Sequence, residues 1–398
     1  TAIGAYALDA NTTASNNTAV GHDALGLNTT GTQNIAIGNY SLDANTGGNY
    51  NVAVGYEALS ALTGGQNTAV GYRASASVTT GDRNTAVGES ALQGCTTGAF
   101  NVAIGSRAMI SGNGSNNVVI GKSAAEDGSF TGSNNVAIGY YAASQLEAAS
   151  QNTVIGAYAG EDLTTAQYST LIGYTAGRNI TTATGNTVLG HNCLVALVTG
   201  NNNVSIGINN LYQANGGNNN VAVGAGAGAA VTSGYSNTLI GINAGMSITT
   251  GHNNSCIGLN SNVAGATSTN SVTLGDGNIT SLRCAVTSIT SVSDRRDKTD
   301  IVDLPLGIDF INKLRPVKFE WQRRTPDETT GKVRAGFIAQ ELQVAQSDCK
   351  YMDLVLEDNP DKLEATPGNL IPVLVNAIQE LSEKNDALEA RLAALEGS

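Results

Sequence analysis

The chain has 398 residues, 41% of them apolar, and a formal net charge of −12 at pH 7. It can therefore bury a core, while the acidic balance without a clustered basic face argues against nucleic acid as a partner. The longest apolar runs are too short to span a bilayer, so we expect no membrane insertion. The 48 glycines and the 5% aromatic content indicate a repetitive architecture.

A repeat of the form Asn-(Thr/Val/Ile)-Ala-(Val/Ile)-Gly fills residues 1–275. Its glycine recurs from Gly4 to Gly275 at a spacing of 17 residues, with three intervals off by one, and Val, Ile or Leu always precedes it. Such self-similarity predicts a β-solenoid or β-roll shaft of 17 repeats over 1–275. Because the sequence begins inside a repeat unit, we expect that residues N-terminal to Thr1 are missing.

Each repeat unit has a short strand, a glycine turn, a second segment and a polar return. We predict two short strands and two turns per coil, because helical periodicity is absent. We expect the residue before the glycine to point inward and the preceding alanine to point outward. A small apolar outer residue indicates a packed second surface, most simply sister chains about a threefold axis. Whether a chain stacks its own coils or three chains interwind stays open.

The repeat is similar to the head domains of trimeric autotransporter adhesins, whose somewhat shorter Asn-x-x-Ala-(Ile/Val)-Gly β-rolls form trimers. This resemblance implies a homotrimer. Tyrosines also recur at one corner of the coil, where they either cap the corner or stack on sugars of a host cell-surface glycan or contact a receptor protein. The candidate glycan contacts are Tyr56, Tyr72, Tyr140, Tyr158 and Tyr174.

After the repeat, we interpret residues 276–292 as an extended connector and 293–398 as a small α+β domain. Short strands or turns are predicted over 310–314, 317–321 and 335–338, and a loop between Pro360 and Pro367. The cysteines are odd in number and lack a Cys-x-x-Cys pair, which indicates small buried residues and no metal site. They are Cys95, Cys193, Cys256, Cys284 and Cys349.

The chain is predicted to end in a helix over about 370–396 with heptad spacing, which is typical of a coiled coil. A polar residue in such a seam usually fixes its register. The alternative is an ordinary amphipathic helix packed on its own domain. The predicted seam is Leu374, Ile378, Leu381, Asn385, Leu388, Leu392 and Leu395.

Ser293 precedes Lys298 by five positions in the run Ser-Asp-Arg-Arg-Asp-Lys. Five helical residues turn through about 500°, so the two side chains can meet only across a turn or between chains. In a dry pocket a neutral lysine amine can take the serine proton and make the serine a nucleophile. No histidine lies within residues 291–398, which leaves Lys298 as the best base there; the alternative is a solvated loop.

Three further motifs follow this run: Leu314-Arg-Pro-Val-Lys-Phe-Glu-Trp321, Gly336-Phe-Ile-Ala-Gln-Glu-Leu342 and Ile371-Pro-Val-Leu-Val-Asn-Ala-Ile-Gln-Glu-Leu381. In this order the motifs resemble the C-terminal intramolecular chaperone domain of phage endosialidase tailspikes, over residues 291–398. The resemblance implies that the domain trimerises the preceding fibre and then cuts itself off between Val292 and Ser293. It implies Ser293 as the nucleophile and Lys298 as the general base.

Together these features predict a homotrimeric fibre with a self-releasing assembly chaperone, from a phage tail fibre or related virion appendage that attaches to a host. We expect no cofactor, and no catalysis beyond a single self-cleavage. The alternative is a bacterial surface adhesin, which would need a signal peptide and a membrane anchor. An enzyme acting on host polysaccharide would need a catalytic domain upstream of these residues.

Overall fold

The computed structural model describes residues 1–126, 130–279, 281, 293–322, 331–357 and 363–396. It divides into two compact units, Thr1–Asp276 and Gly277–Ser398. Among the described residues, no helix combines the length and the apolar character needed to cross a membrane. Cys95, Cys193, Cys256 and Cys349 are buried, as predicted. Cys284 and Val292 lie outside the described residues.

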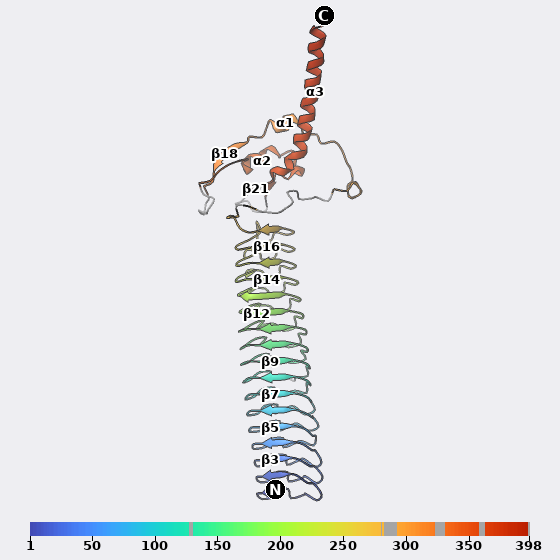
Figure 1. Ribbon diagram of the computed structural model, residues 1–398, viewed down its shortest axis with the longest axis vertical. Coiled ribbons are helices and arrows are strands. Elements are labelled where there is room, and N and C mark those ends of the chain that lie inside the picture. Colours follow the sequence, from blue (N-terminus) through green and yellow to red (C-terminus); the bar gives the residue numbers. More distant parts are fainter. Residues whose placement is uncertain (127–129, 280, 282–292, 323–330, 358–362, 397–398) are drawn as a thin grey trace. The chain divides into compact units, whose positions relative to one another are not determined.

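In the first unit, the described residues form one parallel sheet of seventeen short strands (Figure 1). Each strand pairs with the next strand of the same chain, one repeat further on, as Ala19 does with Ala36. The chain therefore stacks its own coils, and the predicted β-solenoid with 17-residue spacing is confirmed. The strands are Ala2–Ile3 (β1), Thr18–Val20 (β2), Ile35–Ile37 (β3), Val52–Val54 (β4), Thr68–Val70 (β5), Thr85–Val87 (β6), Val102–Ile104 (β7), Val118–Ile120 (β8), Val136–Ile138 (β9), Thr153–Ile155 (β10), Thr170–Ile172 (β11), Thr187–His191 (β12), Val204–Ile208 (β13), Val221–Val223 (β14), Thr238–Ile240 (β15), Ser255–Ile257 (β16) and Val272–Leu274 (β17).

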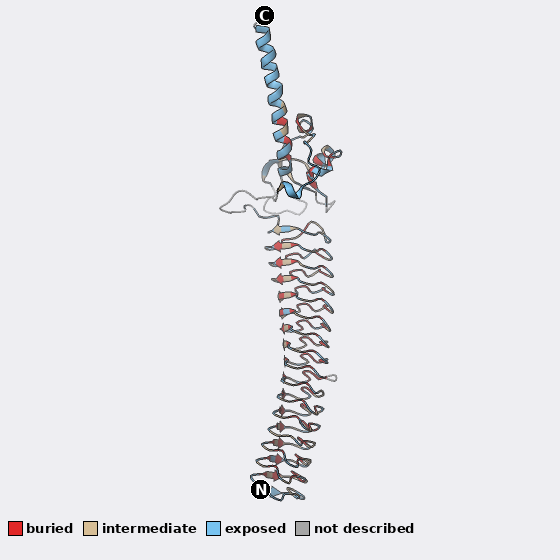
Figure 2. Cartoon of the chain, turned by 90° about the vertical axis from the view of Figure 1, so that its right-hand side faces the viewer, coloured by how far each residue is buried: buried red, intermediate tan, exposed pale blue. Residues whose placement is uncertain are grey.

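The two faces of the strands are opposite to those predicted. The residue expected to face outward is enclosed, as Ala36 is, whereas Ile37 before the glycine is 41% exposed (Figure 2). The physical reason is the thinness of the coil. The strand alanine packs inside the coil in one core with a leucine six residues later, as Ala36 does with Leu42, so a small strand residue fits beside the leucine while the larger residue before the glycine points outward.

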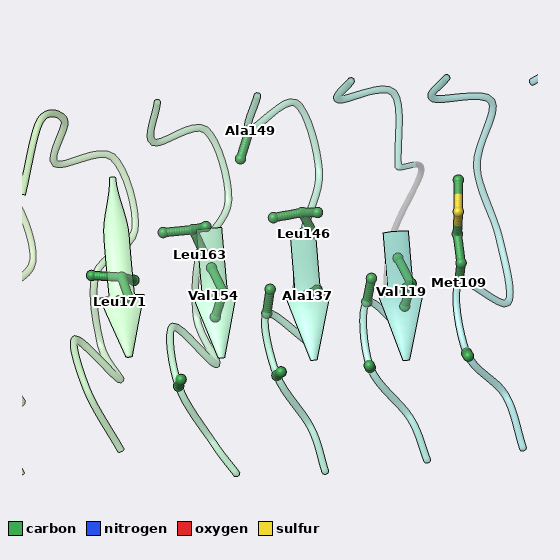
Figure 3. Packing of buried hydrophobic residues seen from close by; sticks show 14 of the residues in the cluster. Met109, Val119, Ala137, Leu146, Ala149, Val154, Leu163 and Leu171 are labelled. Carbon is green, nitrogen blue, oxygen red and sulfur yellow. The ribbon is translucent and has the colours of Figure 1, made fainter. Parts of the chain in front are cut away.

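Where the inward strand residue is large, the residue six positions later is often glycine. A Cβ atom placed on Gly177 would lie 2.9 Å from the Leu171 side chain, and one on Gly245 would lie 2.4 Å from Leu239. The neighbouring coils keep their cores filled by such exchanges of volume. Figure 3 shows core residues of different size, from Ala137 to Leu171, in successive coils. The core is therefore continuous along the stack, although its residues differ from coil to coil.

The second segment of each coil is not a strand, contrary to the prediction of two strands per coil. Every second residue there has a positive φ, such as Asp23 at 55° and Leu25 at 53°. The N–H of Asp23 nevertheless donates to Ala5 in the preceding coil and that of Leu25 to Ser41 in the following coil. These hydrogen bonds on both sides hold a backbone conformation that would be unfavourable alone. The adjacent buried pair Ala24 and Leu25 already breaks the alternation of a strand.

The glycine of the repeat is required by its conformation and by its neighbours. At Gly21, φ is 138°, a value that side chains with a Cβ rarely adopt. A Cβ atom there would also lie 2.6 Å from the carbonyl carbon of Gly38 in the next coil. The coils can therefore approach one another at this corner only because the residue is glycine.

A column of buried asparagines runs beside the strands. The Asn220 side chain donates to the Gly234 carbonyl at 2.8 Å, and its own Oδ1 accepts from the backbone N–H of Asn237 at 3.0 Å. The pattern recurs in nearly every coil, while a serine stands at this position in two of them, Ser169 and Ser271, and the Ser169 hydroxyl accepts from the backbone N–H of Asn186 at 3.3 Å. The column satisfies backbone groups that would otherwise be buried without partners.

We expect Asn220→Ala to destabilise the shaft, because it leaves the N–H of Asn237 and the carbonyl of Gly234 without these partners, at a cost of about 2 kcal/mol. Thermal denaturation followed by circular dichroism measures the effect. Asn220→Ser is the matched control, because a serine hydroxyl already fills this place at Ser169, and it should lose less stability. Equal denaturation temperatures for both variants would contradict this prediction.

The second unit is a small region of helices and antiparallel strands that ends in a C-terminal helix, which confirms the predicted small α+β domain. Its strands pair antiparallel, Val317–Glu320 (β18) with Val333–Gly336 (β19) and Val355–Leu356 (β20) with Glu364–Ala365 (β21). The helices are Ile308–Ile311 (α1), Ala339–Ala345 (α2) and Ile371–Glu396 (α3), with 3-10 turns Arg295–Asp297 (η1), Lys350–Met352 (η2) and Pro367–Leu370 (η3). Phe310, Leu342, Leu354 and Val373 belong to one buried cluster.

Two of the predicted short strands or turns in this unit are only partly right. Residues 310–314 begin within helix α1, where Phe310 points into the core, and continue as a turn at residues 312–313 without a strand. Residues 335–338 complete strand β19 and then lead into helix α2. Pro360, which was predicted to open a loop, lies outside the described residues.

Candidate functional site

The run from Ser293 to Lys298 folds into a tight turn around η1. The Asp294 carboxylate caps the turn by accepting from the backbone N–H of Arg296 at 2.9 Å, and the Arg296 guanidinium donates to it at 2.6 Å. These bonds hold the pKa of Asp294 below its ordinary value. Lys298 closes the turn by donating its backbone N–H to the Arg295 carbonyl at 3.2 Å.

The turn brings Ser293 and Lys298 together. The Lys298 amine lies 2.5 Å from the Ser293 hydroxyl oxygen, to which it donates a hydrogen bond. Proton abstraction needs the reverse arrangement, in which a neutral amine accepts from the hydroxyl. Removal from water favours the neutral amine. Both residues are exposed in the single chain, so the geometry of a nucleophile and base is present without the dry surroundings. Their catalytic roles stay predictions.

A second group of polar contacts fastens the segment after the turn to helix α3. The Asn376 side chain donates to the carbonyls of Leu304 at 3.1 Å and Leu306 at 2.8 Å. Glu380, one helical turn later, accepts from the backbone N–H of Ile308 at 3.0 Å. No role for these two residues is predicted from the sequence, because the contacts span 70 to 72 positions of the chain and carry no local pattern.

Helix α3 packs on its own unit through one face only. Val373 and Ala377 are buried, whereas Ile378 is 66% and Leu381 61% exposed (Figure 2). A shallow groove beside Asn385 is lined mainly by the predicted seam residues Ile378, Leu381 and Leu388. The first turns of the helix are thus amphipathic and packed on their own unit, while the heptad seam faces solvent, and the coiled coil stays a prediction.

The tyrosines singled out at the coil corner lie in rows along the stack. The ring centroids of Tyr56 and Tyr72 are 5.6 Å apart, and the Tyr158 ring lies 5.4 Å from Tyr140 and 6.2 Å from Tyr174. The rows also contain histidines, which the sequence analysis did not include. They are His22 beside Tyr40 and His191 beside Tyr174. The rings contact one another along the stack, and the tyrosine side chains remain partly exposed.

A comparison with protein families gives a match that begins at the serine of this turn. Residues 293–350 match the family model described as chaperone of endosialidase. The model's name classes this family as a peptidase, which points to autoproteolysis. The endosialidase-chaperone region contains η1, the Ser293–Lys298 pair, α1 and α2. The resemblance of this region is confirmed. Searches of curated proteins and of solved structures returned no match.

The endosialidase-chaperone region and the solenoid before it fit a trimeric fibre with an intramolecular chaperone. The family also suggests a fibre associated with a phage. Residues 351–398 lie beyond the match, and they include the whole of helix α3 with its exposed seam.

Proposed function

We propose that the chain forms a homotrimeric fibre of a phage tail or related virion appendage, assembled by its own C-terminal domain, which then cuts itself off between Val292 and Ser293. One observation carries the proposal. The outward residue before each repeat glycine is Val, Ile or Leu along the whole stack, and it lies partly exposed, as in Ile37, Ile104 and Ile240. We refer to this column as the outer apolar face.

The partner that fits the outer apolar face is a second copy of the same chain. A continuous apolar patch of this length is unusual on a monomer. Only another solenoid with the same spacing presents apolar residues at matching heights over so many coils. The exposed heptad seam of α3 is likewise complementary to itself. The number three comes from the resemblance to adhesin heads and to endosialidase chaperones.

Cleavage follows from the same assembly. Sister chains that cover the turn would exclude water from Ser293 and Lys298, and the neutral amine of Lys298 would take the serine proton. The Ser293 oxygen then attacks the carbonyl carbon of Val292, the peptide C–N bond breaks, and the proton passes to the nitrogen of Ser293. Water hydrolyses the resulting ester, which releases a Val292 carboxylate and restores the serine hydroxyl.

Attachment to a host belongs to the same proposal. The rows of exposed tyrosines are the surface where we place contact with a cell-surface glycan or receptor protein, because ring faces can stack on sugars. A bacterial surface adhesin is the alternative. The resemblance of the repeat to adhesin heads is its ground, whereas the family match over residues 293–350 supports the fibre.

The test is the mass of the assembled chain. We expect light scattering and native mass spectrometry of the full chain to give three times the 40.5 kDa of one copy, before or without cleavage. Leu381→Glu places a charge in the seam and should lower the yield of trimers, whereas Glu383→Ala, which is exposed and lies outside the seam, should not. A stable monomer at micromolar concentration would refute the proposal.

A further inference from the structure

We propose that Asn376 and Glu380 are positioning residues that make cleavage depend on helix α3. This inference rests on the proposed self-cleavage and names the part of the structure that regulates it. Asn376 and Glu380 touch neither Ser293 nor Lys298. They hold the segment 304–308, which begins six positions after Lys298, against the helix through which we propose the chains assemble.

The segment is shaped for this attachment. Leu304 and Leu306 are half-buried against the core cluster, and Pro305 between them favours an extended backbone at Leu304. One amide group, that of Asn376, reaches the carbonyls on both sides of the proline. Glu380 then accepts the N–H of Ile308, where α1 begins. By contrast, residues 298–303 are exposed, so these contacts are the first polar anchors to α3 after the turn.

The contacts of α3 with residues 304–308 and its exposed seam lie on opposite sides of the helix. Asn376 and Glu380 lie two residues before and after Ile378, so each is about 160° around the helix from that seam residue. The seam can therefore pack against sister helices while the opposite side keeps its hold on residues 304–308. Assembly of the trimer would thus fix the position of helix α3, and α3 in turn would fix residues 304–308, which follow the turn with Ser293 and Lys298.

The main experiment uses the full chain with Asn376→Ala and Glu380→Ala together. We expect trimers to form, while cleavage, followed by intact mass, slows roughly tenfold to a hundredfold because the reactive groups are misplaced. Glu380→Gln should cleave nearly as fast as wild type, because its amide oxygen can still accept from Ile308. Glu383→Ala is the matched control, an acidic residue on the same helix that is exposed.

Each outcome separates this inference from the proposed function. If wild-type trimers do not cleave, the proposed self-cleavage is wrong. If wild type cleaves and trimers of the double variant cleave at the same rate, the positioning role is wrong. Loss of trimers in the double variant and in both single alanine variants would also overturn the positioning role, because the contacts would then act in folding. Slow cleavage by Glu380→Gln as well as Glu380→Ala would exclude the hydrogen bond to Ile308 as the cause.

Discussion

Ser293→Ala is expected to remain at full length while still forming trimers. Without the hydroxyl no ester can form at Val292, so the cleavage rate should fall by at least ~100-fold. Wild type should instead yield a fragment that begins at Ser293. Intact-mass analysis of freshly folded protein over time, with N-terminal sequencing of the fragment, measures both.

Two further variants test the partner of the serine. Lys298→Arg keeps the positive charge but not the ability to become a neutral base, so it should be as inactive as Lys298→Ala. Thr299→Ala is the matched control, since it removes a hydroxyl next to Lys298 without altering the pair, and it should cleave as wild type does. Cleavage of the Ser293→Ala chain at the wild-type position and rate would rule out the mechanism.

Deletion of residues 299–398 before folding is expected to convert soluble trimers into aggregates. The outer apolar face repeats with every coil, so three shafts can pack in many registers that differ by whole repeats and are nearly equal in energy. A shaft without the C-terminal unit has nothing to select one of them. Sedimentation and light scattering of the truncated and full-length proteins, expressed under the same conditions, measure the difference.

Removal of the same residues after folding should have little effect. A protease site inserted after Lys298 in the Ser293→Ala chain allows the assembled trimer to be cut on demand. The released shafts should stay trimeric, because they can separate only by a slow, unassisted unfolding. Soluble trimers from the truncated gene would show that the shaft finds its own register and would contradict the chaperone role.

The sequence was sufficient for the solenoid but not for its inside and outside. The 17-residue spacing is explicit, because each coil repeats the same turn glycine. Alternation along a strand, however, defines two faces without saying which one is buried. The missing information was the size of the residue six positions after the middle strand residue: small Ala36 is followed by Leu42, and large Leu171 is followed by Gly177. Two side chains whose sizes compensate in this way share one interior, so this pattern would have placed the middle residue of each strand inside the coil.

The residues of the candidate site that lie close together in the sequence were predictable. Ser293 and Lys298 lie five positions apart, and a turn between them is enough to make them meet. Asn376 and Glu380 reach residues that are 70 or more positions earlier, so their roles depend on how α3 packs against α1. A single sequence carries no local signal of such a contact, and only the folded unit supplies it.

The asparagine column has a consequence for how such a molecule can change its length. Each asparagine bonds only within its own coil and to the coils on either side, as Asn220 does with Gly234 and Asn237. Loss of residues 204–220 would therefore join Asn203 to Val221 and restore the same bonds across the new junction. Genetic deletion or duplication of 17 residues can in this way shorten or lengthen the shaft by one whole coil, with the asparagine bonds kept on both sides of the new junction.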